Sequence, residues 1–289
     1  MSPPTQHAPA STFVPAALDG SSWEVLQPYY AQLIGRTVHD SASLERLLLD
    51  RSELDAAADE AAANLYIEMT RHTDDELARK RYLEFVEQVE PELKKAAFAL
   101  DRKIVECPFA QQLDQARYGI LLRGLRRSVE IFREENIPLE TEITKLDQKY
   151  SEANGAMTVE FDGEERTLPQ MAKYLEETDR ARRQASWEAV SARRLQDADR
   201  INDLFEAMLK LRHQVALNAG FPNYRDFQHA RMQRFDYTPK DCERFHEGAE
   251  KVCVPLLRRL NRERAAALGL PRLKPWDLKV DLKGRPPLK

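Results

Sequence analysis

Apolar residues recur along most of the chain at intervals of three and four, the spacing that places them on one face of an α-helix. At one place strict alternation replaces it: Val159 and Phe161 alternate with polar residues, and the dipeptide Asp162-Gly163 favours a hairpin turn. The chain is therefore predicted to be all-α, with one small β-hairpin over about residues 158–168. The predicted helices span residues 23–33, 43–70, 73–93, 110–134, 138–150, 169–178, 179–194, 199–219 and 239–268.

Signals that stop and start helices are concentrated between Asn218 and Pro239. Gly220 follows an apolar-periodic run and suits the left-handed conformation that ends many helices. A short apolar run comes next, and Thr238 then supplies an N-cap with Pro239 at the first helical position. This stretch predicts a helix end, a short helix and the start of a long helix in close succession.

Other segments of the chain contain prolines that interrupt or replace the helical pattern. Pro91 is predicted to kink or split the helix that starts near Thr73, where a capping signal stands. Residues 1–22 begin with a Pro/Ser/Thr/Ala-rich stretch and are predicted to form a flexible tail. Residues 270–289 hold four prolines among apolar residues and are predicted to be extended.

Composition narrows the class of protein. The 289 residues are 42% hydrophobic and 32% charged, with a net charge of -4, which does not suit a general nucleic-acid binder. No apolar run approaches the ~20 residues of a membrane span, and the N-terminus lacks the pattern of a secretory signal. Three widely spaced cysteines without a CxxC pattern argue against a disulfide framework or a structural zinc site. We expect a cytoplasmic protein that contacts neither nucleic acid nor membrane.

A series of short phrases carries a family resemblance. NAGFPNYRDF, RFDYTP, FHEGAEKVCVPLLRRL, PWDL and GRPPL follow one another between residues 218 and 288. In this order they resemble the oligoendopeptidase F branch of the zinc metallo-oligopeptidases, relatives of thimet oligopeptidase. A hairpin followed by the phrase DRARRQA, Asp179 to Ala185, belongs to the same likeness. The resemblance is densest over residues 158–288, is weaker over 23–157, and covers the N-terminal half of such an enzyme.

The resemblance implies an elongated helical body with a deep channel that admits short peptides. It assigns residues 23–194 to a helical N-terminal lobe and residues 195–289 to the opening helices of the catalytic domain, which would be truncated here. In the family, zinc polarises the scissile carbonyl and a water, and the Glu of an HExxH helix acts as the base. Zinc is therefore a cofactor of the full-length family.

The sequence contains no HExxH motif. A hydrolytic zinc needs two histidines one helical turn apart with a glutamate beside the first, and none of the histidines has another four residues on. His246 and Glu250 have that spacing but are interpreted as a surface pair. We therefore expect no metal ligand, no cofactor and no catalytic residue in this chain. The histidines are His7, His39, His72, His213, His229 and His246.

Polar and aromatic residues are densest just after Gly220. One interpretation is a wall of a peptide channel whose side chains hydrogen-bond a peptide backbone. The alternative is an ion-paired corner between helices, in which Arg231 or Arg234 pairs with Asp226 or Asp236. A thiol nucleophile at Cys242 has little support, because no orienting group stands beside it and His246. The candidate peptide-binding residues are Tyr224, His229, Arg234 and Tyr237.

Two functional classes remain open. The first is a non-catalytic N-terminal portion of a cytoplasmic zinc metallo-oligopeptidase that hydrolyses short peptides, inactive by itself. Its partners would be a C-terminal half, or a second copy of the chain, and short peptides once it is joined to a catalytic half. The second is a stand-alone helical binding or scaffold protein derived from the same lobe. A coding region for HExxH directly downstream would favour the first class.

Overall fold

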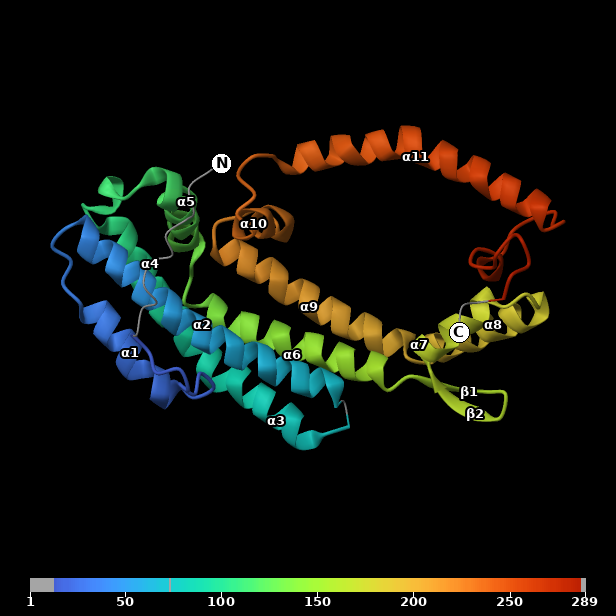
Figure 1. The fold of residues 1–289 in the computed structure, drawn as a ribbon, viewed down its shortest axis with the longest axis horizontal. Coiled ribbons are helices and arrows are strands. Elements are labelled where there is room, and N and C mark those ends of the chain that lie inside the picture. The colour runs from blue at the N-terminus through green and yellow to red at the C-terminus, as the bar shows by residue number, and fades with distance from the viewer. Residues whose placement is uncertain (1–12, 73, 287–289) are drawn as a thin grey trace, which may run out of the picture. The chain divides into compact units, whose positions relative to one another are not determined.

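The computed structural model describes residues 13–72 and 74–286, and the chain divides into two compact units. The first unit comprises Met1–Lys145 and Leu209–Arg234, and the second comprises Leu146–Met208 and Phe235–Lys289. Two helices, α6 (Asn136–Gly155) and α9 (Ala198–Asn218), each contain a boundary between units. The described residues are mostly helical, as the apolar spacing predicts (Figure 1).

The first unit is built around leucine-rich helices. Helix α1 (Trp23–Gly35) packs against α2 (Ser41–Arg71) and α4 (Glu90–Glu106), and α4 packs against α5 (Gln115–Ile131) (Figure 1). Helix α2 starts two residues before the predicted position, at a capping box in which the Asp40 carboxylate accepts from the Ser43 amide at 2.7 Å. The core side chains that are fully buried include Leu26, Leu33, Leu44, Leu47, Leu54, Leu100 and Ile104.

Pro91 splits its helix, as predicted, and the structure shows how. Helix α3 (Glu76–Glu84) is followed by a π-helical turn, Phe85–Val89, in which the Glu90 amide donates to the Phe85 carbonyl. Pro91 then occupies the first turn of α4, where its missing N–H is not needed. The predicted cap at Thr73 lies outside the described residues, and Asp75 caps α3.

Two expectations about the first unit need adjustment. The helix expected from residue 110 begins later, because a 3-10 turn, Ala110–Gln112, precedes α5 and Asp114 supplies its N-cap. Of the segment predicted as a tail, residues 1–12 lie outside the described part of the chain. The Phe13 amide donates to the Glu53 carboxylate at 2.8 Å, and Phe13 packs against the core. The chain therefore packs on the first unit from Phe13.

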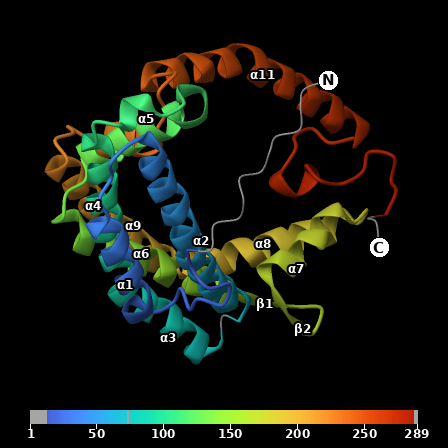
Figure 2. The same ribbon diagram turned by 60° about the vertical axis from the view of Figure 1, so that its left-hand side comes forward.

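The hairpin of the second unit matches the prediction. Strands β1 (Thr158–Phe161) and β2 (Glu164–Thr167) pair antiparallel, with Val159 opposite Arg166. Asp162 and Gly163 have φ angles of 57° and 74°, as a type I′ turn requires. Figure 2 shows the hairpin beside α7 (Leu168–Met171) and α8 (Arg180–Gln196), which it contacts.

The residues at the C-terminal end of the second unit show two contrasting environments. Helix α11 (Pro239–Ala267) begins at the predicted Thr238 cap, yet none of its 29 residues is buried. Residues 270–286 are not simply extended as predicted. A 3-10 turn, Pro275–Asp277, forms, and Trp276 and Val280 are buried within the unit. The apolar residues of this segment explain the difference, because they gain more from burial than an extended chain would give them.

Candidate functional site

The stretch after α9 folds as its sequence predicts. Gly220 adopts a φ of 82°, and the Phe221 amide donates to the Ala216 carbonyl at 2.9 Å, closing the end of α9. Asn223 caps α10 (Tyr224–Arg231) by accepting from the Asp226 amide at 2.9 Å. The predicted succession of helix end, short helix and helix start is therefore confirmed.

The structure distributes the four candidate peptide-binding residues between the two units. Tyr224, His229 and Arg234 belong to the first unit, where all three are half-buried, and Tyr237 belongs to the second, where it is exposed. Tyr224 packs against the cluster around Phe227, and the Arg212 guanidinium lies 5.7 Å from its ring centre. Each unit therefore presents its own part of the candidate set. A role in peptide binding stays a prediction for these four residues.

Two residues of the ion-paired alternative, Asp226 and Arg231, pair with partners other than those expected. The Asp226 carboxylate accepts hydrogen bonds from the side chains of Arg225 and Asn223, each at 2.9 Å. These bonds lower the pKa of Asp226, and the bond from Arg225 has the larger effect. Arg231 lies 3.7 Å from Glu140 of α6, which also pairs with Lys94 at 2.8 Å. The charges of this stretch therefore attach α10 to α6 within the first unit.

A second polar cluster of the first unit joins its three main helices. The Tyr30 hydroxyl of α1 donates to the Asp55 carboxylate of α2 at 2.7 Å. Arg51 of α2 contacts Asp55 at 3.1 Å and Asp101 of α4 at 2.6 Å. Burial raises the pKa of Asp101, against the opposing effect of the Arg51 guanidinium. Because its charges are paired, we interpret the cluster as a structural link between helices.

In the second unit, two of the segments that carry the family resemblance contact each other through buried charged side chains. Asp277 of the PWDL phrase is fully buried and accepts from Arg180 of the DRARRQA phrase at 2.9 and 3.0 Å. Arg183 donates to the Trp276 carbonyl at 2.8 Å and to Asp277 at 3.3 Å. Burial acts to raise the pKa of Asp277, but the hydrogen bonds from Arg180 and from the Lys274 amide outweigh it and lower that pKa. No pattern in the sequence indicates this contact.

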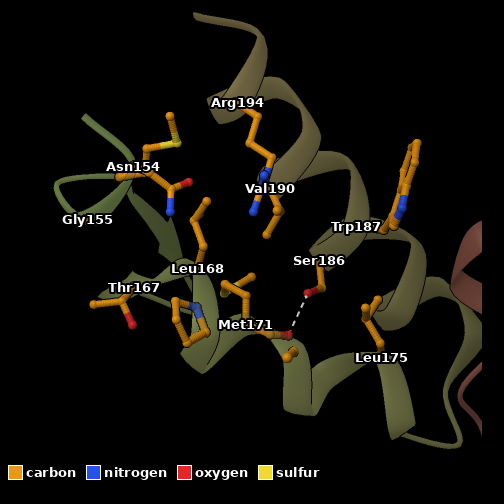
Figure 3. A pocket seen from close by; sticks show the side chains of 13 residues that line it. Asn154, Gly155, Thr167, Leu168, Met171, Leu175, Ser186, Trp187, Val190 and Arg194 are labelled. Carbon is orange, nitrogen blue, oxygen red and sulfur yellow. Dashed lines mark hydrogen bonds between the residues drawn. The ribbon is translucent and has the colours of Figure 1, made fainter. Parts of the chain in front are cut away.

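An apolar pocket of about 470 Å³ lies between the hairpin region and α8 of the second unit (Figure 3). Its inner wall is formed by the buried side chains of Met157, Leu168 and Met171. Ser186 is buried there too, and its hydroxyl donates to the Met171 carbonyl at 3.2 Å. The polar residues of the lining are otherwise Asn154, Thr167 and Arg194. Because these residues come from three separate stretches of the chain, helical spacing alone could not bring them together.

The described residues do not fit a metal centre. No group of three or more His, Cys, Asp or Glu side chains in residues 13–72 and 74–286 is arranged to hold a metal ion. The catalytic zinc that the resemblance implies for the full-length family therefore has no ligand set in this part of the chain, and no reaction step is assigned to it here. Within the same residues, none of the helices has both the length and the apolar character to cross a membrane.

Comparison with protein families agrees with this fold. The model of the peptidase M3 N-terminal domain matches residues 16–132, and the model of peptidase family M3 matches residues 173–283. The chain therefore carries the N-terminal domain of the M3 peptidases followed by part of the M3 peptidase domain. This confirms the resemblance read from the sequence phrases. A search of curated proteins found no match.

Solved structures share the fold over nearly the whole chain. A putative oligoendopeptidase F from Bacillus anthracis str. Ames is 20% identical with a TM-score of 0.84, over 90% of this chain and 48% of its own. PZ peptidase A with an inhibitor is 24% identical with a TM-score of 0.84, over 89% and 46%. The oligoendopeptidase-F of Enterococcus faecium is 14% identical with a TM-score of 0.69, over 90% and 55%. The chain thus spans about half the length of these relatives.

Proposed function

We propose that the chain is the non-catalytic N-terminal portion of a cytoplasmic zinc metallo-oligopeptidase that hydrolyses short peptides. The observation that carries this proposal is the order of the two M3 matches, the N-terminal domain first and the peptidase domain second. The absence of a metal-binding group in the described residues supports a portion that is inactive alone. The free thiols of Cys107, Cys242 and Cys253 suit a reducing compartment.

A partner for helix α11 follows from its exposed apolar side chains. Val252, Leu256 and Leu260 recur every four residues and share one face, and they are 69%, 46% and 48% exposed. Contiguous apolar area of this kind marks an interaction surface. We propose that a polypeptide bearing the HExxH half of the M3 domain covers this face.

In the assembled enzyme we propose that Tyr224, His229, Arg234 and Tyr237 contact the peptide substrate. The support is chemical: hydroxyl, imidazole and guanidinium groups all hydrogen-bond to peptide carbonyls. Their position near helix ends, at residues 224–237, suits side chains that must reach a ligand.

The test begins with the DNA that follows codon 289. We expect it to encode an HExxH motif, in frame or one frameshift away. The chain is then co-expressed with the downstream polypeptide, and hydrolysis of a quenched peptide is measured with and without a chelator. We expect hydrolysis that the chelator abolishes, whereas the chain alone binds no stoichiometric zinc and cleaves nothing. Unrelated downstream sequence, or peptidase activity of the chain alone, would contradict the proposal.

A pair of variants tests the role of α11 in the same assay. Leu256→Glu places a charge in the exposed apolar face and should prevent assembly, measured by co-purification of the downstream polypeptide. Arg258→Glu is the matched control, because side chains two positions apart on a helix point to roughly opposite sides. If both variants lose assembly equally, or if both still assemble, the assignment of this face is contradicted.

A further inference from the structure

The apolar pocket of the second unit has the features of a ligand site. Its volume of about 470 Å³ falls in the range of small-molecule pockets, roughly 300–1,000 Å³. Such pockets combine an apolar lining with a few convergent polar groups that orient the ligand. Here the lining is mainly Met, Leu, Val, Pro, Ala and Trp side chains, and it contains no Asp or Glu.

Two polar side chains at the pocket can donate hydrogen bonds to an acceptor or an anion. In Figure 3 the side chains of Arg194 from α8 and Asn154 from α6 converge on the space above Leu168. Among the described residues, no hydrogen bond or ion pair engages either of these side chains. A guanidinium has only donors, and an amide nitrogen adds two more. Together they offer hydrogen bonds to a carboxylate at the pocket mouth.

Arg194 is exposed at the pocket mouth, and the acid that follows it along the chain does not neutralise it. Asp197, the next acid along the chain, is bonded to Arg193, so it does not neutralise Arg194. Ser186, at the inner wall, donates its proton to the Met171 carbonyl. The inner wall therefore presents apolar surface, and the charged recognition lies at the mouth.

We propose that this pocket binds a carboxylate joined to an apolar group, with the apolar group inside and the carboxylate on Arg194 and Asn154. Two sources share this chemistry: the C-terminal residue of a short peptide that ends in leucine or a similar side chain, and a free medium-chain fatty acid. The peptide source rests on the proposed peptidase function, whereas the fatty acid source does not depend on it. In either case the chain alone is sufficient for binding.

The experiment uses three probes: a tripeptide ending in a free leucine carboxylate, the same peptide as its C-terminal amide, and decanoate. Each is titrated into the full chain, and dissociation constants are measured by calorimetry and by tryptophan fluorescence. Trp187 lines the pocket, so its emission should change on binding and the Trp187→Phe variant should lose that change. We expect the free carboxylate peptide, decanoate or both to bind. We expect the amide to bind at least about tenfold more weakly, because charge-assisted hydrogen bonds are lost.

Matched variants assign the two ends of the ligand. Arg194→Gln should weaken binding of a carboxylate about tenfold or more without changing binding of the amide. Arg200→Gln removes the same charge from an exposed position outside the lining and should leave binding within about twofold. Ala172→Phe should fill the pocket and weaken binding of every probe. Circular dichroism of each variant checks that it folds.

The outcomes separate the alternatives. Binding of the peptide carboxylate alone assigns the peptide source, and binding of decanoate alone assigns the fatty acid source. Absence of binding by both carboxylates, or binding that Arg194→Gln and Ala172→Phe leave unchanged in folded protein, would overturn the proposal. Because no downstream polypeptide or zinc is present, failure here is distinct from failure of the assembly assay.

Discussion

The two units of the chain are stabilised in different ways. In the first unit, fully buried side chains such as Leu26, Leu47 and Leu100 from three helices meet in one large apolar cluster. The second unit has a smaller apolar cluster around Met157 and Met171, and adds the buried Asp277 with its arginine partners. The stability that comes from burying apolar side chains changes little with pH. The contribution of a buried carboxylate changes as the carboxylate titrates. Both units hold a buried carboxylate, Asp101 in the first and Asp277 in the second, so they differ in the size of the apolar cluster beside it.

The longest helix of each unit sharpens this contrast. Helix α2 has 31 residues and α11 has 29, and both begin at a capping box. Yet α2 buries residues along most of its length, and α11 buries none. Helix start signals act on the first turn alone, so they cannot report what later covers the helix. Whether a helix is buried depends on the surface that packs against it, which the capping residues do not determine.

The largest expected effect is in the core of the first unit. Leu47→Ala removes a side chain with no exposed area and leaves a cavity, and should lower the free energy of unfolding by about 2–5 kcal/mol. Urea denaturation followed by circular dichroism measures the loss. Ile120→Ala on α5 is the matched control, because Ile120 is 83% exposed and its loss should cost less than about 0.5 kcal/mol. Equal effects would contradict an apolar core at Leu47.

A somewhat smaller effect is expected at the charged lock of the second unit, formed by Asp277 with Arg180 and Arg183. Asp277→Asn keeps the size of the side chain but leaves Arg183 buried without its counter-charge. Removing one partner of a buried pair costs about 3–5 kcal/mol. We expect about 2–4 kcal/mol, because the side chain of Arg180 is 40% exposed and keeps part of its solvation. The measurement is urea denaturation at neutral pH.

The same variant tests the pH dependence. The pKa of Asp277 is lower in the folded chain than its ordinary value of 3.8, so its contribution to stability is complete above that value. The contribution is lost as the pH falls from about 4 through the lower folded pKa. The wild type should therefore lose stability more steeply with acid than Asp277→Asn does. Glu160→Gln, at an exposed position of β1, should keep the wild-type slope. Identical slopes in all three proteins would contradict a charged lock.

Features determined by adjacent residues were predictable from the sequence. The hairpin turn at Asp162-Gly163 and the cap at Thr238 depend on residues within a few positions, and both are confirmed. The later start of α5 was missed because Asp114, its actual cap, stands inside a stretch that already has helical spacing. Local chemistry therefore located most elements, and competing caps limited the accuracy of their ends.

Contacts between distant parts of the chain could not be predicted in this way. Arg180 and Asp277 are 97 positions apart, and no periodic pattern relates two such residues. The pocket near Arg194 likewise gathers side chains from several elements. For the candidate peptide-binding residues, the sequence grouped Tyr224 and Tyr237 by proximity along the chain. The structure places them in different units, because the boundary falls after Arg234.

An intermediate effect is expected at the hairpin turn, whose local geometry contributes to the second unit. Gly163 has a φ of 74°, and a Cβ there would meet no atom within 4 Å, so any penalty arises from the backbone rather than from a clash. Gly163→Val should cost about 1 kcal/mol or more, because a β-branched residue is strained at positive φ. Gly163→Asn is the control, since Asn tolerates this conformation. Thermal unfolding with equal melting temperatures for wild type and Gly163→Val would show the turn assignment to be wrong.

The smallest effect on stability is expected on α11, where the contrast with α2 is sharpest. Leu257 is 56% exposed, so Leu257→Ala removes little buried area and should change the free energy of unfolding by less than about 0.5 kcal/mol. The same substitution should reduce binding of a hydrophobic dye and self-association in light scattering, because it removes exposed apolar surface. Leu47→Ala provides the comparison, with a large loss of stability for the same change of side chain. A loss of several kcal/mol at Leu257 would mean that α11 packs on the rest of the chain in solution.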